Sequence, residues 1–139
     1  MARPSAIHQP TLLGSIEPRL AADATPERVA LDAVSWIDVS REWLLGGDEL
    51  AARLIDEVPW RQGRRKMWDR MVDDPRLSYW TRAEDPWFDP SLPAMQRALE
   101  HAYGHRFRRP GLNYYRHGRD SVAWHADRDL RALDDILVA

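Results

Sequence analysis

The sequence contains no cysteine and no long apolar run, although it has 139 residues and is 44% hydrophobic. The lack of cysteine excludes disulfide scaffolds and zinc-thiolate sites, and it is typical of proteins from a reducing compartment. No segment approaches the roughly 20 apolar residues of a transmembrane helix, and residues 1–20 lack the apolar core of a secretory signal. We therefore expect a cytoplasmic protein without a membrane partner.

An excess of either charge is also missing, since 20 Lys and Arg residues and 22 Asp and Glu residues give a net charge of −2. This balance argues against a generally basic nucleic-acid-binding protein, but it permits local basic patches. Lysine is nearly absent, because Lys66 is the only one. A chain of this length can bury a hydrophobic core without covalent staples, and a single domain is expected.

The spacing of apolar and turn-forming residues predicts an α+β fold with two helices packed on a sheet. Helices are expected at 49–58, after a break and an N-cap at 46–48, and at 93–103, with Ser91 or Leu92 at its start and Gly104 just past its end. Strands are expected at 34–39 and 75–80, and a turn-rich connector at 85–90. Residues 1–27 carry four prolines without a sustained period, so we expect an irregular tail there and a domain over 28–139.

The most basic stretch of the chain, residues 60–68, begins and ends with tryptophan and includes Arg64, Arg65 and Lys66. Cations attract phosphate and aromatic rings stack on bases, so this composition suits nucleic acid. A solvated, charged loop whose tryptophans pack on the preceding helix explains it equally. Another pair, His101 and His105, has the spacing of metal ligands on a helix, but Gly104 breaks the helix between them and no carboxylate completes a set.

The sequence predicts a strand, a glycine-containing turn and a second strand over residues 112–129. Because side chains alternate along a strand, His125 and Asp127 project to the same side. An imidazole and a carboxylate so placed provide half of the two-His-one-carboxylate set of non-haem iron oxygenases. The His-x-Asp pattern occurs by chance in many proteins, so its weight depends on its surroundings.

Asn113 and Tyr115 offer an amide and a phenol on one face of the preceding strand, where they could hydrogen-bond a carboxylate ligand. A connection over 117–121 would pair Asn113 with His125 and Tyr115 with Ala123 on a common face. A connection over 117–120 would put the two pairs on opposite faces. Val122 and Trp124, on the other face from His125, are expected to pack in the core.

Residues 113–129 read N-x-Y-R-x-G-x-D-S-V-x-W-H-x-D-x-D. This pattern resembles the signature of the AlkB family, Fe(II)- and 2-oxoglutarate-dependent dioxygenases that reverse alkylation damage in nucleic acids. Looser likeness at 36–39, 43–44 and 58–60 extends the resemblance over about residues 34–139. It implies a double-stranded β-helix, or jelly roll, of which this chain would be the N-terminal part.

The resemblance also assigns roles to individual residues. His125 and Asp127 would bind Fe(II), Asn113 and Tyr115 would hold 2-oxoglutarate, and Asp129 would contact the damaged base. The segment 60–68 and the strand 77–80 would correspond to a nucleotide-recognition lid. Tyr79 would be a stacking partner there, and Arg64 and Arg65 would contact alkylated DNA or RNA.

The family's distal histidine and its 2-oxoglutarate-binding arginines have no counterpart before Ala139, where the chain ends in an apolar run. We therefore expect the 139-residue chain to be inactive alone and the longer protein to be a monomer. Two alternatives stay open: a non-catalytic module that binds nucleic acid through 60–68, and an AlkB-like oxygenase for a substrate other than nucleic acid.

Overall fold

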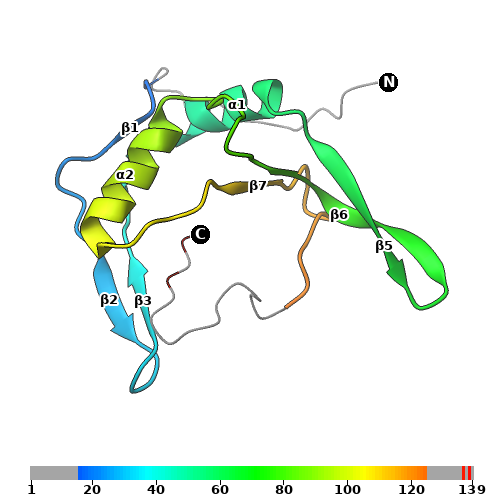
Figure 1. Cartoon of the computed structure of the whole chain (residues 1–139), viewed down its shortest axis with the longest axis horizontal. Coiled ribbons are helices and arrows are strands. Elements are labelled where there is room, and N and C mark those ends of the chain that lie inside the picture. The colour runs from blue at the N-terminus through cyan, green and yellow to red at the C-terminus, as the bar shows by residue number, and fades with distance from the viewer. Residues whose placement is uncertain (1–15, 125–135, 137, 139) are drawn as a thin grey trace.

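The computed structural model describes residues 16–124, 136 and 138, in which two helices accompany three small antiparallel sheets (Figure 1). The elements in chain order are β1 (Arg19–Leu20), β2 (Glu27–Ala30), β3 (Trp36–Val39), β4 (Leu44–Leu45), α1 (Gly47–Glu57), β5 (Arg61–Met67), β6 (Arg70–Trp80), α2 (Ser91–Tyr103) and β7 (Gly111–Tyr114). The sheets are β1–β4, β2–β3 and β5–β6–β7. This arrangement confirms the α+β class, whereas the jelly roll stays a prediction.

Helix α1 confirms the predicted helix but begins earlier than expected. Its N-cap is Gly46, with φ 73°, and not Asp48, which lies in the first turn. A Cβ atom at Gly46 would collide with the backbone of Ile16, so this position needs glycine. Leu50 and Val58 are buried at the two ends of the helix and, with Leu92 of α2, form the apolar centre of the described residues.

Helix α2 begins at Ser91, one of its two predicted starts, and follows the N-cap Pro90. Asp89, which was expected in a connector, provides a side-chain acceptor at this helix start. The Asp89 carboxylate, 2% exposed as a residue, accepts a hydrogen bond from the backbone N–H of Ser91 at 2.8 Å. Arg53 of α1 donates to the same carboxylate at 3.1 Å, which ties the two helices together. Gly104, with φ 61°, ends α2 as predicted.

The basic stretch is a strand and not the loop that the sequence suggested. Strand β5 pairs with β6 in a long hairpin that projects away from the helices (Figure 1). The register shifts between Gln62 and Arg64, where Gly63 faces Asp74 so closely that a Cβ atom would collide with its carboxylate. Pro75 lies in β6 at this bulge, a place where a strand accommodates proline.

The predicted hairpin over 112–129 is confirmed only in its first strand, β7, which pairs with β6. Residues 121–124 have no strand assignment, so neither predicted register occurs among the described residues. The backbone N–H of Ser121 instead donates to the carbonyl of Pro75 in β6 at 2.8 Å. Val122 and Trp124, expected in the core, are both exposed, because the chain turns back toward β6 and not onto β7.

The N-terminal segment contributes to the fold although it was expected to be irregular. Its Arg19 and Leu20 form β1, which pairs with β4, and Glu27 begins β2. The β2–β3 hairpin attaches to α2 through Asp38, which accepts hydrogen bonds from Arg28 at 2.7 Å and from the Tyr103 hydroxyl at 3.0 Å. Among the helices of the described residues, none is long and apolar enough to cross a membrane.

Candidate cofactor-binding face

The two faces of the sheet β5–β6–β7 differ in what covers them. In β6 and β7, Ser78 lies opposite Asn113 and Tyr79 lies opposite Leu112. Since opposed residues share a face and successive residues alternate, Asn113 and Tyr79 point to opposite sides of the sheet. The register therefore puts Asn113, predicted to hold 2-oxoglutarate, and Tyr79, predicted to stack on the substrate, on opposite faces of the sheet.

The face that carries Tyr79 is packed against the rest of the molecule. The Tyr79 ring meets Phe88 edge-on at 5.6 Å, and Tyr114 contacts Trp60 at 5.5 Å between ring centroids. The Tyr79 hydroxyl donates to Asp85 at 2.9 Å, and this hydrogen bond raises the pKa of Tyr79 above its ordinary value. Tyr79 is thus engaged in internal packing in the structure.

The opposite face is open and holds the two residues predicted to bind 2-oxoglutarate. Asn113 is exposed, and Tyr115, just after β7, is 45% exposed. Trp80, on the same face, is 74% exposed, and its ring lies over Gly111 of the neighbouring strand. An amide, a phenol and an aromatic ring therefore share an accessible surface of β6 and β7.

Arg76 joins this surface from β6 and is not among the predicted site residues. Its Nε–H donates to the Asn113 side-chain oxygen at 3.0 Å, and its guanidinium also reaches the Ser121 carbonyl at 3.5 Å. No sequence motif singled out this arginine. Alternation along the predicted strand 75–80 puts Arg76 and Ser78 on one face, but only the register between β6 and β7 brings that face beside Asn113.

The turn after β7 precedes the predicted iron ligands in the sequence. Arg116 and Asp120 form a paired guanidinium–carboxylate contact, with Arg116 Nε donating to Asp120 at 2.7 Å. The backbone N–H of Arg116 donates to the same carboxylate at 2.9 Å. These hydrogen bonds from Arg116 lower the pKa of Asp120 to about 2.

Arg64 and Arg65 lie in the β5–β6 hairpin, away from Asn113. Each is paired across the hairpin, Arg64 with Asp73 at 2.9 Å and Arg65 with Asp74 at 3.0 Å. Consecutive strand residues point to opposite faces, so the two arginines do not form one cationic patch. Both are more than half exposed, and ion pairs so exposed contribute little to stability.

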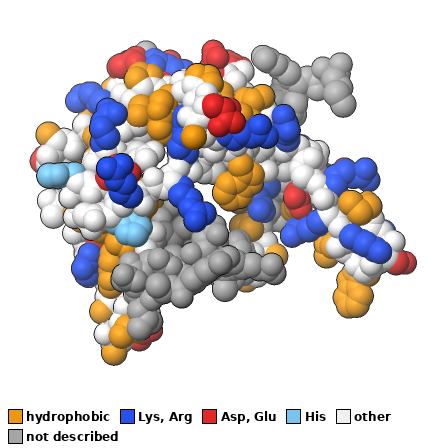
Figure 2. All heavy atoms as spheres, in the orientation of Figure 1, with side chains coloured by type: hydrophobic (Ala, Val, Ile, Leu, Met, Phe, Trp, Pro, Cys, Tyr) orange, Lys and Arg blue, Asp and Glu red, His pale blue; other side chains and the backbone are white. Residues whose placement is uncertain are grey.

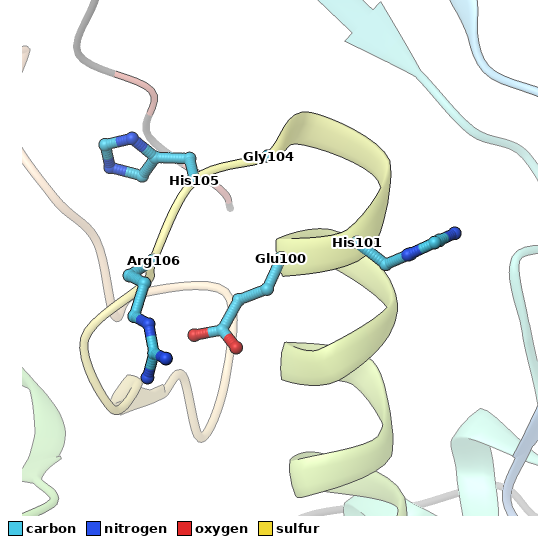
Figure 3. A pocket seen from close by; sticks show the side chains of 5 residues that line it. All are labelled: Glu100, His101, Gly104, His105 and Arg106. Carbon is cyan, nitrogen blue, oxygen red and sulfur yellow. The ribbon is translucent and has the colours of Figure 1, made fainter.

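The predicted iron ligands His125 and Asp127, and the predicted base contact Asp129, lie outside the described residues. Within the part that is described, no group of three His, Asp or Glu side chains could hold a metal ion. Figure 3 shows His101 and His105 pointing in different directions beside a shallow pocket that Glu100 and Arg106 also line. The two imidazoles therefore do not converge on a common point.

Comparison with known proteins supports the resemblance found in the motif. The chain is 31% identical over 136 residues to alpha-ketoglutarate-dependent dioxygenase alkB homolog 3 of Rattus norvegicus, with 80% of this chain and 46% of the relative covered. The protein of the same name from Homo sapiens is 29% identical, with 80% of this chain and 48% of that protein covered. The chain is AlkB-like.

The AlkB-like chain spans about half the length of these curated relatives. The similarity implies Fe(II) and 2-oxoglutarate as cofactors. No family model and no solved structure matches the chain.

The open face fits the carboxylate end of 2-oxoglutarate. Because arginine is a donor only, the Asn113 side chain turns its oxygen toward Arg76. The NH2 group of the amide therefore faces away from Arg76 and is available as a donor. The exposed Tyr115 phenol adds a second donor near the same surface. Two donors on an accessible face are the groups that an anionic ligand requires.

Proposed function

We propose that the protein is an AlkB-like dioxygenase that removes alkyl groups from nucleic-acid bases with Fe(II), 2-oxoglutarate and oxygen. The observation that carries the proposal is the open face of β7, which presents Asn113 and Tyr115 shortly before the His125-x-Asp127 motif. The name of the relatives, which includes dependence on alpha-ketoglutarate, supports the same chemistry.

In this proposal each cofactor is held by residues already named. Asn113 and Tyr115 donate hydrogen bonds to 2-oxoglutarate, while His125 and Asp127 supply the imidazole and carboxylate for iron. When bound, Fe(II) and 2-oxoglutarate would activate oxygen, so that one oxygen atom oxidises 2-oxoglutarate to succinate and carbon dioxide and the other hydroxylates the N-alkyl group, which then leaves as an aldehyde. Asp129 accepts a hydrogen bond from an exocyclic N–H of the base.

The β5–β6 hairpin is the proposed nucleic-acid contact. Figure 2 shows Lys and Arg side chains along this hairpin and an apolar side chain at its tip. Lys66 and Arg70 have no ion pair within the described residues, so they are better placed for phosphate than Arg64 and Arg65. Arg64 and Arg65 contribute by exchanging their carboxylate partners, Asp73 and Asp74, for phosphate.

The tip of the hairpin strengthens this assignment. Trp68 is 92% exposed and has φ 60°, a conformation that side-chain-bearing residues rarely adopt. Glycine would adopt this backbone conformation more easily than tryptophan. Strained positions of this kind are common at functional sites. An exposed indole on a cationic hairpin is suited to stack on an unpaired base.

Asp127→Ala tests the catalytic part of the proposal in the protein of natural length. We expect the variant to lose 2-oxoglutarate decarboxylation and demethylation of a methylated oligonucleotide together, since both need iron. Asp48→Ala, which removes an exposed carboxylate from the first turn of α1, is the matched control and should keep both activities. Retention of both activities by Asp127→Ala would refute the ligand assignment.

A non-catalytic nucleic-acid-binding module is the second candidate. The cationic hairpin lies within the described residues, and none of its side chains is a proposed iron ligand. Binding of a single-stranded oligonucleotide at increasing salt, with and without Fe(II), separates the two. Steep salt dependence with no 2-oxoglutarate turnover would favour the module. Turnover of 2-oxoglutarate without preference for nucleic acid would favour an oxygenase for another substrate.

A further inference from the structure

The amide of Asn113 has a fixed orientation because of its neighbour Arg76. An asparagine side chain can present either its oxygen or its NH2 group to a ligand. The guanidinium has no acceptor, and its Nε–H lies 3.0 Å from the Asn113 oxygen. The NH2 group must therefore face away from Arg76, and it meets no hydrogen-bond acceptor within the described residues.

The position of Arg76 follows from the strand pairing. Leu77 is the partner of Tyr114, so continuing this register by one residue puts Arg76 opposite Tyr115. Its side chain then shares a face with Asn113 and Tyr115, with Tyr115 directly opposite and Asn113 on the diagonal. Asn113 and Tyr115 are the residues that the proposed function assigns to 2-oxoglutarate.

Arg76 and Pro75 also hold Ser121, which precedes the proposed iron ligands in the sequence. The Arg76 guanidinium reaches the Ser121 carbonyl at 3.5 Å, and the Pro75 carbonyl accepts from the Ser121 N–H at 2.8 Å. Both contacts fasten Ser121 to β6 four residues before His125. One side chain thus touches the cofactor residue Asn113 and the backbone that precedes the metal motif.

We propose that Arg76 is a positioning residue for the 2-oxoglutarate site, which acts by holding the Asn113 amide with its NH2 group toward the ligand carboxylate. This inference rests on the proposed function, since it needs 2-oxoglutarate to bind at Asn113. Without the arginine, the amide rotates freely and presents its oxygen, which repels a carboxylate, for part of the time. Arg76 itself makes no contact with the ligand in this arrangement.

The first test measures 2-oxoglutarate binding calorimetrically, without oxygen, in the protein of natural length. Arg76→Ala should weaken 2-oxoglutarate binding about five- to tenfold, the loss that corresponds to one hydrogen bond. Arg76→Lys retains a donor and should recover part of the affinity. Arg97→Ala, which removes an exposed arginine from α2, is the matched control and should bind normally.

A double-mutant cycle with Asn113→Ala separates positioning from direct ligand contact. If Arg76 acts through Asn113, then Arg76→Ala costs little more affinity once Asn113 is alanine. Additive losses would overturn the proposal and make Arg76 a direct ligand contact. Unchanged binding in folded Arg76→Ala would also overturn it, whereas absence of 2-oxoglutarate binding in the wild type would refute the proposed function instead.

The orientation itself can be observed without any ligand. The two side-chain NH2 protons of Asn113 give a pair of signals in nuclear magnetic resonance spectra. In the wild type the Asn113 side-chain NH2 group should have a high order parameter, because rotation about its Cβ–Cγ bond is restricted, and Arg76→Ala should lower that order parameter. Equal order parameters in both proteins would show that Arg76 does not hold the amide.

Discussion

At the scale of single residues, the turn after β7 depends on the ionised form of Asp120. Its carboxylate is 3% exposed and accepts hydrogen bonds from Arg116, which hold its pKa at about 2, below the ordinary 3.8. A carboxyl group with a lowered pKa contributes stability above its ordinary pKa and loses it as the pH falls toward the lowered value. The turn should therefore weaken between about pH 4 and pH 2.

Asp120→Asn tests this dependence. The variant should melt a few degrees lower than the wild type at pH 7, because it loses the charge that attracts Arg116. The difference in melting temperature should shrink as the pH falls toward 2, where the wild type also loses the charge. A difference that stays constant over this range would contradict the assignment, and Asp48→Asn serves as the exposed control.

The sequence predicted some of these residue positions and missed others for physical reasons. Alternation along a strand suffices to put Asn113 and Tyr115 on one face. It cannot reveal that Arg76 lies beside them, because cross-strand neighbours depend on register. It also cannot show that Tyr79 faces inward, since an aromatic residue suits both a packed face and a ligand surface.

At the scale of secondary-structure elements, the start of α2 depends on Asp89. This buried carboxylate accepts from Ser91 and from Arg53. Burial alone would raise its pKa, but the hydrogen bonds from Ser91 and Arg53 outweigh that effect and lower it. Its charge therefore stabilises the helix and the contact between α1 and α2.

Asp89→Ala should reduce the free energy of unfolding by about 1–3 kcal/mol, because it removes the cap of α2 and leaves Arg53 without this partner. Asp89→Asn keeps the acceptor for Ser91 but loses the attraction to Arg53, so its cost should be smaller. Urea denaturation followed by circular dichroism measures both. Wild-type stability in Asp89→Ala would refute the capping role.

The hairpin β5–β6 shows where the sequence was misleading at this scale. The charged stretch 60–68 lacks apolar alternation, so its pattern predicts a loop. Pairing with β6 makes it a strand, because cross-strand contacts such as Arg64 with Asp73 replace apolar packing. The helices were easier to predict, since their apolar spacing and the glycines at Gly46 and Gly104 are local signals.

Trp68→Gly should separate the stability of this hairpin from its function. Glycine adopts the positive φ of this position easily, so the melting temperature should stay equal or rise. Binding to a single-stranded oligonucleotide should weaken about tenfold, the loss expected for one stacked base. A variant that binds as tightly as the wild type would show that Trp68 does not stack on the substrate.

At the scale of the whole molecule, the described residues leave large apolar side chains accessible on several elements. Trp80 on the open face and Val29 and Ile37 in the β2–β3 hairpin are each more than two-fifths exposed. The chain spans about half the length of its curated relatives. The architecture of the whole protein could not be predicted from local patterns, because sheet order depends on long-range pairing.

The seventeen-residue motif carried most of the functional prediction, and the comparison supports the family that it indicated. The structure places Asn113 and Tyr115 on an accessible face, while His125, Asp127 and Asp129 lie outside the described residues. The expectation that the 139-residue chain is inactive alone stays a prediction.

The most direct test of the central claim measures succinate and aldehyde together in the protein of natural length. Fe(II), 2-oxoglutarate, oxygen and a methylated oligonucleotide are supplied, with an unmethylated oligonucleotide and a chelator as controls. We predict that succinate and aldehyde form in nearly equal amounts, that succinate formation falls without the methyl group, and that chelation abolishes both. Succinate without aldehyde, or demethylation that persists with the chelator, would contradict the account.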